Sequence, residues 1–184
     1  MKTLEQIYYD NRLVMGNSGG DKGTNHSFIQ HYQEWFEPYR NSQINFLEIG
    51  VDDGNSIKMW REYFTRANIY GADLRDRTKL PIDNVKIFCG DSTQKSFWDA
   101  IDIKFNIVIE DGSHLLEHQI ETFRCMKDKV ESGGIYIIED VLPHIESAFE
   151  RFNQEFPNDF KMFDFRNERP NQGDNVLFVH INEK

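Results

Sequence analysis

The stretch N-I-V-I-E-D-G-S-H, from Asn106 to His114, is a short apolar run that ends in acidic residues, and G-G-I-Y-I-I-E-D-V, from Gly133 to Val141, has the same form. Such runs are typical of strands that are buried on both faces of a parallel sheet. If the two strands are neighbours, their ends lie about 5 Å apart. Carboxylates gathered there repel one another unless a cation or protons lie among them. The pair of stretches therefore predicts a divalent metal site with His114 beside it.

Strand and helix patterns alternate along the chain from residue 26 onward. The patterns predict helices over 26–37, 55–64, 93–100, 117–130 and 144–156, and strands over 45–51, 68–74, 85–89, 106–110, 134–139, 160–165 and 175–181. Alternation of this kind predicts an α/β fold, with a mainly parallel seven-stranded sheet and helices on both faces. The last two strands share a short connection and must be antiparallel. A Rossmann-like sheet with an antiparallel C-terminal hairpin is the layout of class I methyltransferases, by analogy of fold.

Length and charge limit what the chain can be. We expect residues 1–184 to form one domain, because a chain of 184 residues is long enough for one sizeable core. The net charge of −10 argues against nucleic acid and favours a small neutral or cationic partner. We see neither a signal peptide nor an apolar run of the roughly 20 residues that span a bilayer. With cysteines only at Cys89 and Cys125, far apart in sequence, we expect a soluble, reduced, cytoplasmic protein.

Residues 1–25 are the most polar and glycine-rich part of the chain, with Gly16, Gly19, Gly20 and Gly23. The ordinary interpretation is a mobile leader. The alternative is a lid in which Lys22 and His26 close over a bound cofactor, and both interpretations stay open.

The first predicted strand runs into L-E-I-G-V-D-D-G-N-S, from Leu47 to Ser56, a glycine-containing turn before a helix. Gly50 allows a tight turn, and Gly54 allows close approach of a ligand at the helix start. The dinucleotide fingerprint G-x-G-x-x-G is absent, because Asp52 occupies its second glycine position. Acidic residues in the turn also repel phosphate. S-adenosylmethionine, which has no phosphate and carries two cationic groups, fits this turn better than NAD does.

Acidic residues also end the next two predicted strands. Asp73 lies where an acid commonly binds ribose hydroxyls, and Asp91 lies where it could reach an adenine edge. Glu110 should point to the face of its strand opposite Asp111, toward the cofactor or behind the metal ligands. The complete predicted cofactor set is Glu48, Gly50, Gly54, Ser56, Asp73, Asp91, Ser92, Glu110 and Lys22.

The chain resembles the metal-dependent sugar O-methyltransferases of macrolide biosynthesis, the mycinamicin methyltransferase group. The resemblance rests on D-K-G-T-N-H-S-F (Asp21–Phe28), L-E-I-G-V-x-x-G, G-A-D-L, G-D-S, E-D-G-S-H, H-Q-I-E-T-F (His118–Phe123) and G-G-I-Y-I-I-E-D-V. It implies that Asp111, Glu139 and Asp140 bind Mg²⁺, or another hard divalent cation, and that His114 is the catalytic base next to Asp111. It also implies that Glu48, Gly50, Asp73 and Asp91 belong to the cofactor site.

We therefore expect an S-adenosylmethionine- and Mg²⁺-dependent O-methyltransferase that acts on a hydroxyl of a sugar or other small polyol. One alternative is a catechol-type phenol O-methyltransferase, and another is a non-catalytic cofactor-binding subunit that partners an active enzyme. We expect neither nucleic acid nor membrane as a partner, and a homo-oligomer stays open. Because adjacent residues of a strand point to opposite faces, Glu139 and Asp140 can both reach one metal only if the strand has ended before them.

Overall fold

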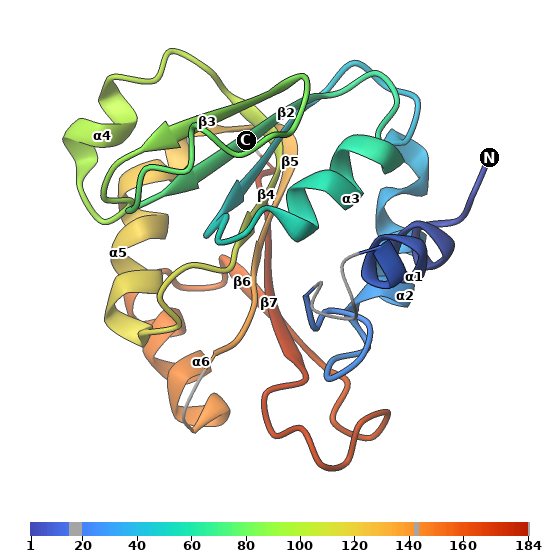
Figure 1. Ribbon diagram of the computed structural model, residues 1–184. Coiled ribbons are helices and arrows are strands. Elements are labelled where there is room, and N and C mark those ends of the chain that lie inside the picture. Colours follow the sequence, from blue (N-terminus) through green and yellow to red (C-terminus); the bar gives the residue numbers. More distant parts are fainter. Residues whose placement is uncertain (15–19, 142–143, 184) are drawn as a thin grey trace.

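The structure, a computed structural model, describes residues 1–14, 20–141 and 144–183 (Figure 1). Its strands are β1 (Asn45–Ile49), β2 (Asn68–Asp73), β3 (Val85–Cys89), β4 (Phe105–Glu110), β5 (Val130–Ile138), β6 (Phe160–Asp164) and β7 (Val176–Ile181). Its helices are α1 (Leu4–Val14), α2 (Phe28–Phe36), α3 (Asn55–Tyr63), α4 (Lys95–Asp99), α5 (Leu116–Met126) and α6 (Ile145–Glu155), with short 3₁₀ turns at Glu37–Tyr39 and Lys127–Lys129.

The described strands form one seven-stranded sheet in the order β3-β2-β1-β4-β5-β7-β6. Strands β1 to β5 pair in parallel, and β7 pairs antiparallel with both β5 and β6. The predicted α/β fold and its antiparallel C-terminal hairpin are therefore confirmed. The two strands that end in acidic residues, β4 and β5, are direct parallel neighbours, so the condition on which the predicted metal site depended is met.

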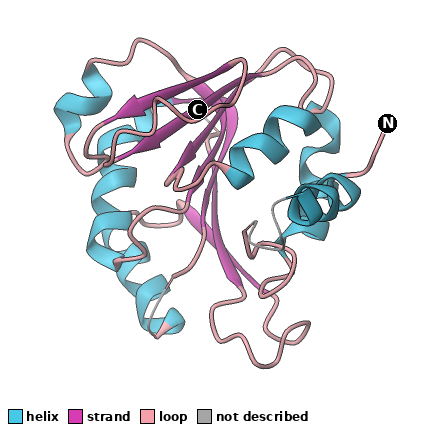
Figure 2. Cartoon of the chain, viewed as in Figure 1, coloured by secondary structure: helices cyan, strands magenta, loops and turns pink. Residues whose placement is uncertain are grey.

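Helices cover both faces of the sheet (Figures 1 and 2). One core is built on α1, α2 and α3, where the fully buried rings of Phe36, Phe46 and Trp60 pack against one another in edge-on and tilted arrangements. The other lies under α4, α5 and α6, where Phe123 packs on Tyr136. Aromatic side chains bury large areas each, so the fifteen phenylalanines give this small domain two well-filled layers.

Helix α1 is a feature that the sequence analysis did not predict. Leu4, Ile7 and Tyr8 lie on one side of it, are at most 5% exposed, and belong to the same core as α2 and α3. Burial of these three apolar side chains on one face stabilises the helix, although the residues around them are polar. Gly16 and Gly19, which we included in the leader or lid, lie outside the described residues.

Strand β5 begins earlier than predicted. Its first residue is Val130, and Gly133, which we expected to end the preceding helix, lies within the strand at φ +73°. The β4–β5 pairing shifts register between Phe105 and Ile107, opposite this point. A glycine tolerates the positive φ that such an irregularity needs.

The parallel strands all present their carboxyl ends at one edge of the sheet. From β1 the chain runs outward through β2 to β3 on one side, and then crosses back to β4 on the other side of β1, so the strand order reverses beside β1. In open α/β sheets this switch point is where ligands bind. Separately, the described residues contain no helix with both the length and the apolar character needed to cross a membrane.

Candidate active site

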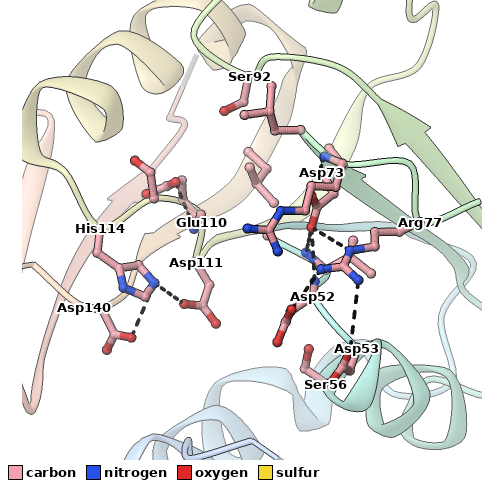
Figure 3. Close-up of a pocket in the computed structure, with 18 of the residues that line it drawn as sticks. Asp52, Asp53, Ser56, Asp73, Arg77, Ser92, Glu110, Asp111, His114 and Asp140 are labelled. Carbon is pink, nitrogen blue, oxygen red and sulfur yellow. Dashed lines mark hydrogen bonds and ion pairs between the residues drawn. The ribbon is translucent and has the colours of Figure 1, made fainter. Parts of the chain in front are cut away.

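A cavity of about 840 Å³ opens at the switch point, above the ends of β1, β2 and β4 (Figure 3). The predicted residues that line it are Lys22, Gly50, Ser56, Asp73, Asp91, Ser92, Glu110, Asp111, His114 and Asp140. Glu48, Gly54 and Glu139 lie behind this lining. The structure therefore gathers most of the predicted site from six separate segments into one space.

Gly50 makes the turn at the end of β1, with φ +90°. Its amide donates to Ala72 O at 2.8 Å, and a Cβ added to it would lie 1.9 Å from Asp111 O. No side chain fits between these backbones, so the close approach of β1 and β4 needs glycine here. This contact also fixes the position of Asp111 relative to the turn.

We predict that Gly50→Ala will lower the free energy of unfolding by about 1–3 kcal/mol, because it adds a backbone overlap to an unfavourable φ. Chemical denaturation of the two proteins measures the difference. Gly133→Ala is the matched control, since Gly133 also has a positive φ but nothing within 4 Å of an added Cβ. Equal losses in the two variants would show that the contact with Asp111 does not matter.

Asp73, the last residue of β2, fixes the shape of the turn that follows β1. Its Oδ2 accepts hydrogen bonds from the backbone amides of Val51 and Asp52 at 3.0 and 3.1 Å, and its Oδ1 accepts one from Arg75 N at 2.8 Å. Its role with ribose stays a prediction. The structure does give it a second role, which is to fix the shape of the turn.

Arg77 is a residue of this cavity that the sequence analysis missed. Its guanidinium lies 3.0 Å from Asp52 Oδ1, and 3.9 Å from both Asp53 Oδ1 and Asp73 Oδ2 (Figure 3). It therefore offsets the mutual repulsion of three acids at the mouth of the turn. Only Asp73 lies near Arg77 in the sequence; Asp52, its nearest partner in space, is 25 positions away, so sequence spacing does not reveal the cluster.

On the far side of the cavity, Asp91 accepts hydrogen bonds from the amide and hydroxyl of Thr93, and these bonds lower its pKa. Ser92 Oγ lies 3.0 Å from Thr122 Oγ1. Both residues line the cavity, as predicted, and their contacts with a cofactor stay predictions.

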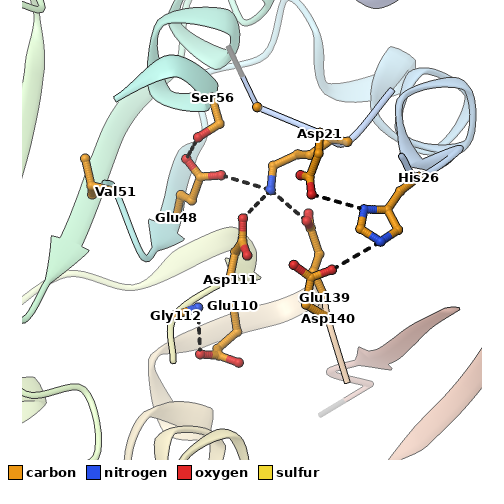
Figure 4. A network of polar contacts seen from close by, with 12 residues as sticks. Asp21, His26, Glu48, Val51, Ser56, Glu110, Asp111, Gly112, Glu139 and Asp140 are labelled. Atoms are coloured by element: carbon orange, nitrogen blue, oxygen red, sulfur yellow. Dashed lines mark hydrogen bonds and ion pairs between the residues drawn. The ribbon is translucent and has the colours of Figure 1, made fainter. Parts of the chain in front are cut away.

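Lys22 lies among three carboxylates. They belong to Glu48, Asp111 and Glu139, which are labelled in Figure 4. The lysine Nζ donates to Asp111 Oδ2 at 2.5 Å and to Glu139 Oε2 at 2.6 Å, and lies 3.7 Å from Glu48 Oε1. Its side chain is only 4% exposed. Burial alone would lower the pKa of Lys22, but the charges of Asp111, Glu139 and Glu48 outweigh burial and raise it well above its ordinary value.

Glu48 and Glu139 are buried partners of this ammonium. Glu48 also accepts from Ser56 Oγ at 2.5 Å, and burial raises its pKa to about 6. Glu139 accepts from Tyr32 OH at 2.7 Å, and burial raises its pKa as well. Both oxygens of Glu139 are thus engaged away from the cavity, and its role as a metal ligand stays a prediction.

Asp111, His114 and Asp140 form a connected group that faces the cavity (Figure 3). His114 Nε2 lies 3.0 Å from Asp111 Oδ1 and 3.6 Å from Asp140 Oδ2. Strand β5 ends at Ile138, so the condition that Glu139 and Asp140 lie beyond the strand is met. Asp140 then adopts φ +52°, and its carboxylate lies toward His114 (Figure 3). The carboxylate of Glu139 instead contacts Lys22.

This group has the composition of a site for a hard cation. Burial and the nearby charge of Asp111 raise the pKa of Asp140 to about 6. Its Oδ1 is buried and makes no hydrogen bond within the described residues. Carboxylate oxygens are the ligands that Mg²⁺ prefers, and an unpaired buried carboxylate oxygen is costly without a cation. The residues present therefore fit a divalent metal.

Comparisons with known proteins agree with this geometry. The chain is 37% identical over 126 residues to the mycinamicin VI 2''-O-methyltransferase of Micromonospora griseorubida, which is 63% of this chain and 32% of that protein. It is 34% identical over 129 residues to the demethylmacrocin O-methyltransferase of Streptomyces fradiae, which is 65% of this chain and 33% of that protein. The chain is a homologue of sugar O-methyltransferases. It spans about a third of the length of the curated relatives it matches.

A solved structure extends the likeness to the whole fold. A methyltransferase of the mycinamycin biosynthetic pathway, in complex with Mg and SAH, matches with a TM-score of 0.76 and 25% identity, over 98% of this chain and 55% of that one. No protein-family model matches this homologue. Its sheet, with helices on both faces and an antiparallel hairpin at the end, is that of a Rossmann-like class I methyltransferase.

Glu110 lies on the opposite face of the strand end from Asp111, as strand alternation predicted (Figure 4). Its Oε1 accepts from Gly112 N at 3.2 Å, and its Oε2 is buried without a hydrogen bond in the described residues. Burial raises its pKa to about 8. A proton on this carboxyl would relieve its repulsion with Asp111.

His114 gives a pH-dependent prediction for the metal-free protein. Its hydrogen bond to Asp111 raises its pKa to about 9. Since the folded pKa lies above the ordinary value of about 6.5, the pair stabilises the fold fully below that value, and this stabilisation is lost as the pH rises through about 9. NMR titration of the His114 ring should have its midpoint near 9. Asp111→Asn should move the midpoint down, and an unmoved midpoint would contradict the pairing.

Proposed function

We propose that this chain carries an S-adenosylmethionine- and Mg²⁺-dependent O-methyltransferase activity toward a hydroxyl of a sugar or other small polyol. The observation that carries the proposal is the group formed by Asp111, His114 and Asp140 at the edge of a methyltransferase sheet, beside the Gly50 turn. Homology to sugar O-methyltransferases supports it. The mycinamycin-pathway structure that matches over nearly the whole chain contains Mg and SAH.

The cofactor would lie along the ends of β1, β2 and β3. Gly50, and Gly54 in the predicted set, would shape the turn beside it. Asp73 and Asp91 would contact its ribose and adenine, and Ser56 and Ser92 would line its sides. Glu48 and Lys22, held together at 3.7 Å behind the turn, would face its charged amino-acid end. The acidic lining favours a cation such as a sulfonium over a phosphate.

Asp111 and Asp140 would bind the metal, with Glu139 as the third predicted ligand. Bound there, a divalent cation supplies Lewis acidity that lowers the pKa of an acceptor hydroxyl. His114 is the residue that would take the hydroxyl proton as the oxygen attacks the methyl carbon and the sulfonium sulfur leaves. Because Nε2 contacts Asp111, the accepting nitrogen would be Nδ1. Asp111 holds the imidazole in position through its 3.0 Å contact. The walls of the cavity orient the two reactants for in-line displacement.

The partner that we propose is a small glycosylated or polyhydroxylated molecule rather than nucleic acid, in keeping with a net charge of −10. Two free thiols, Cys89 and Cys125, support a reducing, cytoplasmic location. In the alternative, a catechol-type phenol O-methyltransferase, the acceptor would use the same carboxylates. Only the shape of the acceptor would distinguish it from a sugar methyltransferase.

Calorimetry with S-adenosylmethionine, with and without Mg²⁺, tests the cofactor site. We expect saturable binding of one cofactor per chain, weakened in Asp73→Ala. Each lost hydrogen bond to a charged group should cost about 1.5–3 kcal/mol of binding free energy. Absence of binding by the intact chain would contradict the proposal, and binding without any turnover would favour the non-catalytic alternative.

A further inference from the structure

A second group of potential ligands lies on the other side of Asp140. It consists of His26, Asp140 and Asp174, whose ligand atoms all lie within 4.8 Å of one another. The three residues come from the segment before α2, the loop after β5 and the connection between β6 and β7. Figure 4 shows His26 on the side of Asp140 away from Asp111.

His26 is the feature that separates this group from an ordinary surface cluster of acids. It is only 3% exposed, yet neither ring nitrogen makes a hydrogen bond within the described residues. Its Nε2 points into the group, 3.1 Å from Asp174 Oδ1 and 3.6 Å from Asp140 Oδ1. Asp140 Oδ1 is itself buried without a hydrogen bond. A buried polar atom that makes no hydrogen bond costs free energy, so a cation between these two atoms would stabilise both.

Packing, not hydrogen bonding, fixes the ring. His26 stacks on the buried Phe28 with ring centroids 4.6 Å apart and an angle of 3° between the planes. Its Nδ1 lies 3.7 Å from Asp21 Oδ2, on the side away from the group. The ring is therefore held with its Nε2 directed between two carboxylates.

The spacing of the three atoms suits a cation. Ligands bound at about 2.0–2.2 Å around one ion lie about 3–3.5 Å from each other in tetrahedral or octahedral geometry. The two distances from His26 Nε2, 3.1 and 3.6 Å, are close to that spacing before any adjustment. One imidazole nitrogen with carboxylate oxygens suits a first-row divalent ion such as Mn²⁺ better than Mg²⁺.

We propose that His26, Asp140 and Asp174 bind a second divalent cation of the Mn²⁺ class, and that Asp140 bridges it to the site of Asp111 and His114. The bridge follows from the two oxygens of Asp140, since Oδ1 faces His26 at 3.6 Å and Oδ2 faces His114 at 3.6 Å. This cation would tie the segment before α2 and the β6–β7 connection to the mouth of the cavity. The second site does not depend on the proposed methyl transfer.

The test is the metal content of the full chain, stripped with chelator, equilibrated with Mn²⁺ and freed of loose ions by gel filtration. We expect His26→Gln and Asp174→Asn each to retain one ion fewer than the unaltered chain. Asp111→Asn should lose the other ion and retain this one. Asp21→Asn is the matched control, since it removes an acid near His26 without removing a ligand, and it should retain the full content.

Equal Mn²⁺ content in the unaltered chain, His26→Gln and Asp174→Asn would overturn the second site. If only Asp111→Asn loses Mn²⁺, the result supports only the site of Asp111 and His114. If only His26→Gln and Asp174→Asn lose Mn²⁺, it supports only the site of His26 and Asp174. Electron spin-echo spectra of Mn²⁺ in a His114→Ala background provide an independent measurement. We expect nitrogen modulation from His26 that disappears in His26→Gln, and its absence from the His114→Ala protein would also overturn the proposal.

Discussion

Replacing His114 with glutamine should lower the methyl-transfer rate by roughly 10²–10⁴-fold, the range expected for loss of a general base. Glutamine keeps a hydrogen-bonding side chain near Asp111 but cannot accept a proton at neutral pH. Affinity for S-adenosylmethionine should change little, because His114 contacts Asp111 and Asp140 rather than the Gly50 turn. Single-turnover rates at saturating cofactor measure the loss.

His31→Gln is the control for this experiment. His31 stacks on Phe165 and lies 3.1 Å from Glu168, and it does not line the cavity. Its replacement should leave the rate within a few-fold. A rate in His114→Gln equal to that of the unaltered chain would assign the proton to a metal-bound carboxylate or to water instead.

Replacing Lys22 with methionine should lower the free energy of unfolding by about 3–5 kcal/mol in metal-free buffer, as expected when one partner of a buried ion pair is removed. The substitution keeps much of the apolar stem but removes the ammonium that contacts Asp111 and Glu139. The buried carboxylate of Glu139 and the partly buried one of Asp111 then lose the cation that offsets their repulsion. Equilibrium denaturation in chelator at neutral pH measures this difference.

Lys95→Met is the matched control, because Lys95 also pairs with an acid, Asp99, but on the exposed surface of α4. Exposed pairs contribute little to stability, so this variant should unfold almost as the unaltered chain does. If Lys22→Met lowers the free energy of unfolding no more than Lys95→Met does, the ammonium of Lys22 does not stabilise the carboxylates around it.

Most of the fold could be predicted because the signals are local. The run from Ile107 to Glu110 is apolar and then acidic, and the structure buries it between β1 and β5. The short connection before Val176 required an antiparallel hairpin, and β6 and β7 form one. Chain connectivity and two-sided burial leave few other arrangements.

Helix α1 was missed for a physical reason. Glycines after Gly16 and polar residues throughout dominate the composition of residues 1–25. The signal that could have found the helix is the spacing of Leu4, Ile7 and Tyr8, three apolar residues on one helical face. These side chains stabilise the helix only when they pack in one core with α2 and α3. No local sequence pattern reveals that packing.

The sequence analysis predicted residues that the structure gathers around one cavity, but it did not predict the contacts between them. Lys22 contacts Asp111 and Glu139, which are 89 and 117 positions away in the sequence. Sequence spacing cannot reveal such a contact, because it depends on how the segment before α2 packs across the sheet edge. The divergence of Glu139 from Asp140 depends likewise on a single positive φ, +52° at Asp140.

Transfer of an isotope-labelled methyl group from S-adenosylmethionine to sugar acceptors with neighbouring hydroxyls tests the central claim most directly. The reaction is followed by mass spectrometry in Mg²⁺ and in excess chelator. We predict one labelled methyl ether per acceptor in Mg²⁺, little or none in chelator, and little or none in Asp140→Asn under either condition. Equal methylation by the unaltered chain with and without chelator would contradict a metal-dependent O-methyltransferase built on Asp111, His114 and Asp140.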